Sequence, residues 1–158
     1  MGSQWQTDNL SSTYLEGIRT AIPFADENMD LMIRVARAWT PGVERFLDLG
    51  CGDGVLGRAL QQSFPNAEAV FVDFSDPMIE ATRRNIESCT RAQIIKADFS
   101  DPGWLADLGD NARFDLIVSG YAIHHLPDVR KKQLYAEIFG LLKSNSVFLN
   151  MEHVSSST

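Results

Sequence analysis

The fold of this chain is decided by the stretch Phe46-Leu47-Asp48-Leu49-Gly50-Cys51-Gly52-Asp53-Gly54-Val55-Leu56-Gly57. Its apolar start predicts a short strand, its end predicts the start of a helix, and glycines at alternate positions lie between them. Glycines cluster in this way where the backbone passes close to a ligand or adopts a positive φ. A glycine-rich turn from strand to helix is typical of a nucleotide-type binding site.

The same glycines also fit the dinucleotide fingerprint G-x-G-x-x-G over residues 52–57. A nicotinamide-dependent oxidoreductase is therefore one hypothesis. Two features argue against it, namely Asp48 inside the strand and the pair Asp98-Phe99 further along the chain.

Length and composition limit the class of protein. The chain has 158 residues, which predicts one domain, and it carries 14 basic and 21 acidic residues, a formal net charge of −7. Acidic chains are poor partners for a phosphate backbone, so we expect no nucleic acid partner. The basic clusters at residues 83–84 and 130–132 are interpreted as solvated helix faces. No apolar run approaches the roughly 20 residues of a membrane span, and no signal peptide is visible.

The two cysteines, Cys51 and Cys89, do not suggest a disulfide framework. A reducing, cytoplasmic setting is therefore expected. No histidine-rich or cysteine-rich spacing predicts a metal site.

Apolar runs alternate with helical periodicity along most of the chain. Five runs, nearly continuous rather than alternating, predict parallel strands covered on both faces: residues 45–49, 69–73, 93–97, 114–119 and 146–151. Helices are predicted between them over residues 55–64, 77–88 (capped by Asp76), 104–108 and 129–143. This order predicts an α/β fold with a doubly wound, mainly parallel sheet of about five strands.

Two further helices, over residues 12–20 and 26–39, are predicted before the first strand. They suggest an N-terminal helical cap or lid over residues 1–40 and a binding core over residues 41–158. The region of residues 14–19 is interpreted either as part of that lid or as a simple packing helix.

In an open α/β sheet, ligands bind beyond the carboxyl ends of the strands. Three successive strand ends offer a carboxylate there, from Asp48, Asp73 and Asp98. An acid about 20 residues beyond the glycines can accept hydrogen bonds from ribose hydroxyls, which suits Asp73. Asp98 could accept from the exocyclic amine of adenine, or it could cap a turn with Ser100. Phe74 and Phe99 could stack on the ring, or they could be core residues.

These segments resemble the motifs of the class I S-adenosylmethionine-dependent methyltransferases, especially the members that act on small molecules. The similar segments are residues 48–54, 71–78, 96–99, 114–128 and 141–145, in the family's order. Asn145 stands where a glycine is usual.

The resemblance implies a Rossmann-like fold, S-adenosylmethionine as cofactor and a small-molecule acceptor. The cofactor-binding residues that it implies are Asp48, Gly50, Cys51, Gly52, Asp73, Phe74, Met78, Asp98, Phe99, Ser119, Gly120 and Tyr121. His124 and His125 could serve as a general base because histidine titrates near neutrality, or they could pack in the loop and face solvent.

The family's sheet has seven strands, whereas this chain has length for five. One hypothesis is that the exposed edge strand, residues 147–151, pairs with a second copy of the chain. An alternative function is a shortened methyltransferase, or a binding module for S-adenosylmethionine, without full catalytic activity.

Overall fold

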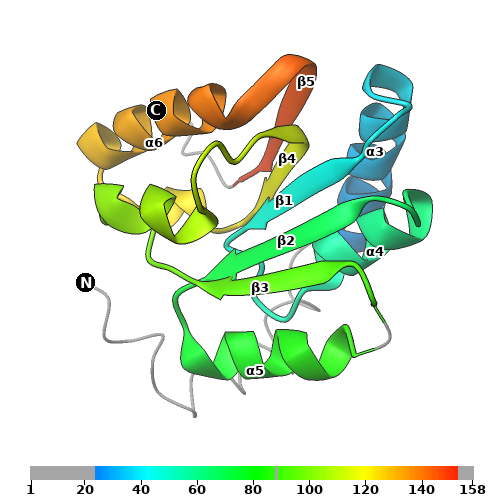
Figure 1. The fold of residues 1–158 in the computed structure, drawn as a ribbon, viewed down its shortest axis with the longest axis horizontal. Coiled ribbons are helices and arrows are strands. Elements are labelled where there is room, and N and C mark those ends of the chain that lie inside the picture. The colour runs from blue at the N-terminus through cyan, green and yellow to red at the C-terminus, as the bar shows by residue number, and fades with distance from the viewer. Residues whose placement is uncertain (1–23, 88, 153–158) are drawn as a thin grey trace.

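A single parallel sheet forms the centre of the molecule. The structure, a computed structural model, describes residues 24–87 and 89–152. Its strands are β1 (Arg45–Leu49), β2 (Glu68–Asp73), β3 (Ala92–Lys96), β4 (Phe114–Gly120) and β5 (Leu142–Met151). They lie in the order β3-β2-β1-β4-β5, and every pairing is parallel (Figure 1). The α/β, doubly wound fold predicted from the sequence is confirmed.

Helices follow the strands as right-handed crossovers require. They are α3 (Ala25–Trp39), α4 (Val55–Ser63), α5 (Asp76–Asn85) and α6 (Asp128–Leu141), with short 3₁₀ helices at Pro102–Leu108 and Ile123–His125. None of the helices in the described part of the chain is long and apolar enough to cross a bilayer.

Alternation along the strands divides the core into two layers. Odd-numbered positions of β1, such as Leu47 and Leu49, pack with Trp104 and with Leu134 and Ile138 of α6. Even-numbered ones, such as Phe46, pack with residues of α3 and α4. Burial on both faces explains why these strands are continuous apolar runs rather than alternating ones.

The sheet's topology places a binding site at the carboxyl end of β1. The chain moves outward from β1 to β2 and β3, and then returns to the other side of β1 for β4 and β5. The loops after β1 and β4 therefore leave in opposite directions, which opens the space where ligands bind in such sheets.

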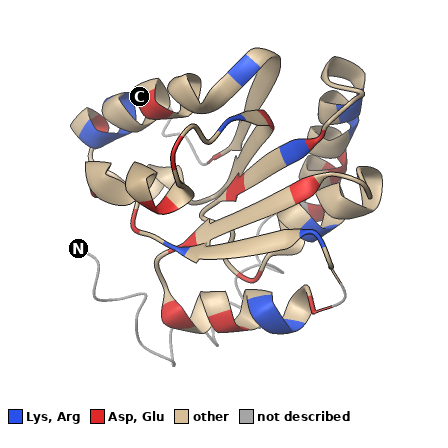
Figure 2. Ribbon diagram, viewed as in Figure 1, with Lys and Arg blue, Asp and Glu red and all other residues tan. Residues whose placement is uncertain are grey.

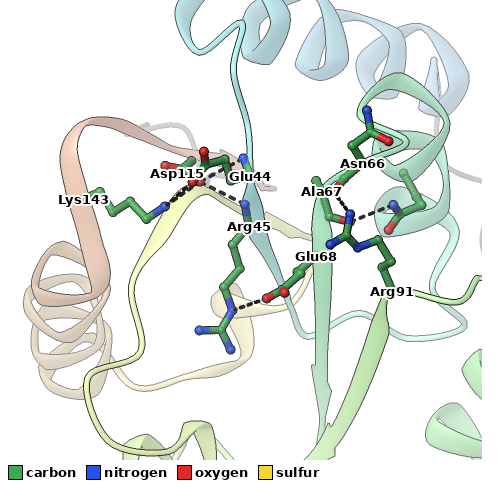
Figure 3. Close-up of polar contacts among 9 residues, drawn as sticks. Glu44, Arg45, Asn66, Ala67, Glu68, Arg91, Asp115 and Lys143 are labelled. Carbon is green, nitrogen blue, oxygen red and sulfur yellow. Dashed lines mark hydrogen bonds and ion pairs between the residues drawn. The ribbon is translucent and has the colours of Figure 1, made fainter.

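A polar cluster ties together the opposite, amino-terminal end of the strands (Figure 3). Asp115 Oδ2 accepts hydrogen bonds from the backbone N–H groups of Glu44 (3.0 Å) and Arg45 (2.9 Å) and from Lys143 Nζ (2.9 Å). These bonds join β1, β4 and β5 far from the carboxyl edge. They outweigh the effect of burial and hold the pKa of Asp115 below its ordinary value.

The boundary between α6 and β5 differs from the prediction of a helix to residue 143 and a strand from 146. The helix ends at Leu141, and β5 begins at once with Leu142. Phe114 pairs with Leu142 but Leu116 with Val147, so β5 carries extra residues in an irregularity that includes Asn145 at φ 63°. The predicted loop is part of the strand because Lys143 is held by Asp115.

The start of α5 also needs correction. Helix α5 begins at Asp76, after an N-cap position at Ser75, so Asp76 is the first helical residue rather than the cap. Its carboxylate instead lies 2.6 Å from Lys96 Nζ. The helix predicted over residues 12–20 lies outside the described residues, whereas α3 agrees with the helix predicted from residue 26, and Met32 and Ala36 of α3 are buried.

Candidate ligand site at the carboxyl edge of the sheet

The loop between β1 and α4 is built on backbone that only glycine adopts easily. Gly50, Gly52 and Gly54 have φ values of 71°, 57° and 80°. The amides of Gly50 and Cys51 both donate to Val72 O, which fixes the loop on β2. A Cβ on Gly50 would lie 2.4 Å from Cβ of Ala122, so a side chain there is excluded.

Asp48 lies beneath this loop and is 1% exposed. Its Oδ2 accepts a 2.8 Å hydrogen bond from the N–H of Gly57, in the first turn of α4. The N-cap position, Gly54, has no side chain to satisfy that turn, so a carboxylate from the neighbouring strand does so. Asp48 therefore fixes where α4 begins.

Asp73 connects the end of β2 to the glycine loop. Its Oδ2 accepts from Gly52 N (2.9 Å) and its Oδ1 from Ser75 N (2.9 Å). Burial raises the pKa of Asp73 above its ordinary value, although these amide hydrogen bonds act in the opposite direction. A desolvated carboxylate at a strand end is a functional-site candidate, because donors from a ligand would compensate its lost hydration.

Helix α5 supports the loop from the other side. Thr82 Oγ1 donates to Gly52 O (2.6 Å), and Asn85 Nδ2 donates to Asp53 O (2.9 Å). Cys51 is buried against Thr82, and burial together with the charges of Asp48 and Asp73 raises the pKa of its thiol, which makes it a poor nucleophile. Sequence analysis missed Thr82 and Asn85, because only the tertiary packing shows that their helix reaches the loop.

The space around the loop differs from one glycine to the next, although the positive φ of Gly52 still disfavours a side chain there. A Cβ built on Gly52 would meet no heavy atom within 4 Å. The loop thus presents backbone to open space at Gly52, while Gly50 is closed off by its neighbours.

The end of β3 also reaches the glycine loop. Phe99 is 7% exposed, and its ring lies 3.4 Å from the position of a Cβ on Gly50. Asp98 is exposed, and its Oδ1 accepts from Ser100 N (2.8 Å), so the turn with Ser100 is present. The aromatic ring thus belongs to the core and to the site at once.

The end of β4 closes the site opposite β2. Ser119 Oγ donates to Leu49 O (2.8 Å), which ties β4 to the end of β1. Tyr121 adopts φ 55°, unusual for a side chain of that size, and its N–H donates to Met151 O (2.7 Å). A Cβ on Gly120 would lie 3.5 Å from Cε of Met151 and 3.6 Å from Cδ2 of Leu56.

His124 is paired with an acid that sequence analysis missed. Its Nδ1 lies 2.6 Å from Glu152 Oε2, and Glu152 Oε1 accepts from the N–H groups of Ile123 (2.7 Å) and His124 (3.2 Å). Burial, together with the proximity of His124, lowers the pKa of His125 against the opposing effect of Glu152. The two rings lie 3.9 Å apart between centroids.

The other two residues predicted to bind a cofactor flank this region. Phe74 is half-buried directly after Asp73, and Met78 is buried in the first turns of α5. Both residues lie close to the end of β2. The hydrogen bonds to the glycine loop are instead made by Asp73, Thr82 and Asn85. Within the described ranges, no group of three or more histidine, cysteine or acidic side chains could hold a metal ion.

A family model described as a methyltransferase domain matches residues 46–145, which is more than half of the chain. The chain belongs to the methyltransferase-domain family. The match begins in β1 and ends in β5, so it covers the glycine loop and all the strand ends described above. Solved structures that share this fold are described as complexes with S-adenosylhomocysteine.

The relatives of this methyltransferase differ in what they act on. Carboxy-S-adenosyl-L-methionine synthase of Nautilia profundicola is 23% identical over 92% of this chain and 59% of its own length. Ribosomal RNA large subunit methyltransferase G of Shewanella loihica is 29% identical over 85% of this chain and 35% of its own length.

Solved structures share the fold. The 1,6-didemethyltoxoflavin-N1-methyltransferase of Burkholderia thailandensis, solved with its namesake compound and S-adenosylhomocysteine, is 20% identical with a TM-score of 0.68, over 89% of this chain and 58% of that one. This chain therefore spans about a third to three fifths of the length of these three proteins.

Proposed function

We propose that this methyltransferase transfers the methyl group of S-adenosylmethionine to a small-molecule acceptor. One observation carries the proposal: the Asp73 carboxylate holds the N–H of Gly52 at 2.9 Å, at a loop position where a Cβ would meet nothing within 4 Å. Asp73 suits a ribose, and the backbone at Gly52 suits an amino-acid tail. One hydrogen bond joins the two.

In the proposed site, each strand end takes one part of the cofactor. Gly50, Cys51 and Gly52 border the methionine portion, while Asp73 accepts from the ribose hydroxyls, with Phe74 and Met78 beside the adenosine. Asp48 orders the loop through the hydrogen bond that it accepts from Gly57 N at the start of α4, and it is proposed to reach the amino group of the methionine portion directly or through water.

The remaining strand ends complete the site. Asp98 and Phe99 border the adenine, and Ser119, Gly120 and Tyr121 lie on the side of the sulfonium. S-adenosylmethionine supplies an already activated methyl group, so aligning the acceptor accounts for much of the rate. The fixed, hydrogen-bonded ends of β1 and β4 provide that alignment.

His124 is proposed as the general base for acceptors that must lose a proton. When Nδ1 donates its hydrogen to Glu152, Nε2 is the basic nitrogen, and the carboxylate stabilises the imidazolium that forms. Glu152 is itself fixed by two backbone amides, so the pair is held in one orientation. Replacing His124 with glutamine should lower kcat about 100-fold and leave the binding of S-adenosylhomocysteine unchanged.

A small acceptor is favoured over RNA by the charge of the chain. The formal net charge is −7. Figure 2 shows basic residues spread over α3, α5, α6 and the strands, rather than gathered over one element. Fluorescence anisotropy with a structured RNA at low salt should show no binding; binding that weakens steeply with salt would instead place this chain with its ribosomal RNA-modifying relative.

The test of activity is methyl transfer from isotopically labelled S-adenosylmethionine to a panel of hydroxyl- and amine-bearing small molecules. Transfer that depends on His124 supports the full proposal. Binding of the cofactor without transfer to any acceptor would support the alternative, a binding module without full catalytic activity. Asp115→Asn is the matched control, because Asp115 lies at the opposite end of the strands.

Three further features of the chain belong to the same proposal. The edge strand β5 pairs only with β4 among the described residues, and it is proposed to pair with a second copy. Sedimentation that shows a monomer at high concentration would contradict this. Of the cap expected over residues 1–40, α3 contributes Met32 and Ala36 to the core cluster that contains Phe46, so only the residues before α3 are proposed to cap the site. The two free cysteines support the proposal of a reducing, cytoplasmic setting.

A further inference from the structure

Arg130 is a buried cation, although the sequence placed it in a solvated basic cluster. It lies in the first turn of α6 and is 7% exposed. Its Nε donates to Phe99 O (2.9 Å), and its two terminal nitrogens donate to the two carboxylate oxygens of Glu137 at 2.7 Å each. Arg130 and Glu137 are seven residues apart, two turns along one face of the helix, and this spacing was the available signal.

Glu137 holds a second segment at the same time. Its Oε2 also accepts from the indole Nε1 of Trp104 (2.8 Å), and Trp104 is fully buried. Burial alone would raise the pKa of Glu137, but the hydrogen bonds from Arg130 and Trp104 outweigh it and lower that pKa. Arg130, Glu137 and Trp104 thus form one hydrogen-bonded cluster, which we name the α6 clamp.

The α6 clamp grips the loop after β3 at both ends. Arg130 holds the carbonyl of Phe99 at its start, and Glu137 holds the side chain of Trp104 at its end. Between them the loop folds on itself, since Ser100 N and Asp101 N donate to the side chain and the carbonyl of Asp98. The positions of Asp98 and of the Phe99 ring are therefore set from α6.

An ion pair between a buried Arg130 and a partly buried Glu137 is a costly way to join two elements. Replacing such a pair with apolar side chains of similar volume is often neutral or stabilising, so stability alone does not account for it. A bidentate arginine does fix direction and distance, which apolar contacts do not. At one end of the clamp, Arg130 binds the carbonyl oxygen of Phe99. The ring of the same Phe99 lies 3.4 Å from the position of a Cβ on Gly50 in the glycine loop.

We propose that the α6 clamp positions Asp98 and Phe99 to discriminate the purine base of the cofactor. The inference rests on the proposed function, in which these two residues border the adenine. The 6-amino group of adenine donates to a carboxylate, whereas the 6-oxo group of hypoxanthine is an acceptor and is repelled by it. Discrimination of this kind depends on the carboxylate being held at the right place, because a loose loop can turn Asp98 toward solvent.

The test compares the affinities of two ligands, S-adenosylhomocysteine and S-inosylhomocysteine, by titration calorimetry. The wild-type chain should bind the adenine compound about tenfold more tightly or better. The double variant Arg130→Met with Glu137→Met replaces the ion pair with apolar side chains of similar volume. Its preference for the adenine compound over the hypoxanthine compound should fall below about threefold. Trp104→Phe keeps an aromatic ring but removes the indole N–H that donates to Glu137. Its preference for the adenine compound should lie between that of the wild-type chain and that of the double variant.

The control variant is Asp115→Asn, which breaks a polar cluster of similar size at the far end of the strands. It should lose stability and keep the wild-type ratio. If the double variant does not fold, the ratio of the two affinities measured for Trp104→Phe decides whether the inference holds. Variants that weaken both ligands equally, and so keep the ratio, would overturn the inference while leaving the proposed function intact. A wild-type chain that binds neither ligand would overturn the proposed function, and the inference with it.

Discussion

A methyl group added at Gly57 would meet two groups on which the glycine loop depends. A Cβ there would lie 2.2 Å from Cε1 of Phe71 and 2.8 Å from Oδ2 of Asp48. Phe71 is fully buried in the interior strand β2, and Asp48 accepts its hydrogen bond from the N–H of Gly57 itself. Neither group can move without disturbing the core or the start of α4.

The size of the effect of Gly57→Ala follows from three contributions. Overpacking a core costs about 1 to 3 kcal/mol. Displacing a carboxylate from a buried N–H costs about 1.5 to 3 kcal/mol. The higher helix propensity of alanine returns about 1 kcal/mol. We therefore expect the free energy of unfolding to fall by about 2 to 5 kcal/mol, and Tm to fall by roughly 5 to 15 °C.

The assay is urea denaturation followed by circular dichroism, with Gly140→Ala as the matched control. Gly140 is also helical, but a Cβ there would meet nothing within 4 Å, so the control should gain about 0.5 to 1 kcal/mol. A Gly57→Ala chain as stable as the wild type would refute the account of how Asp48 joins β1 to α4.

The remaining predictions concern the loop and two titrating groups. Thr82→Val removes the donor to Gly52 O, so the affinity for S-adenosylhomocysteine measured by calorimetry should fall about tenfold; unchanged affinity would show that α5 does not position the loop. The folded-state pKa of Asp115 is lowered, so its contribution is present at neutral pH and is lost as the pH falls below about 4. Asp115→Asn should thus cost about 1 to 3 kcal/mol at pH 7 and progressively less as the pH falls below about 4, and a pH-independent difference would contradict the ion pair with Lys143. Burial, with a smaller contribution from His124, also lowers the folded-state pKa of His125, so stability should decline as the pH falls below about 6.5. His125→Gln should flatten that part of the Tm profile, and an unchanged slope would contradict this account.

Local sequence signals predicted the fold well. The strand β1, the glycine loop and α4 are adjacent in sequence, and the apolar runs of β1, β2 and β4 report burial on both faces directly. Parallel pairing then follows from the helices between the strands, so the whole sheet could be predicted before any contact was known.

The features that sequence analysis missed all depend on partners distant in the chain. Lys143 belongs to a strand because Asp115 binds it, and Arg130 is buried because Glu137 and Phe99 neutralise and satisfy it. Glu152 matters only because β5 ends beside the loop after β4. Apart from the seven-residue spacing of Arg130 and Glu137 on one face of α6, composition and periodicity carry no record of such pairings.

The central claim is that the glycine loop and Asp73 together bind S-adenosylmethionine. The most direct test is titration calorimetry of the wild-type chain with S-adenosylhomocysteine and, in parallel, with NADH, repeated with Asp73→Ala. We predict binding of S-adenosylhomocysteine in the micromolar range, none of NADH, and loss of binding in the variant. Binding of NADH in preference to S-adenosylhomocysteine, or unchanged binding of S-adenosylhomocysteine by the variant, would contradict the claim.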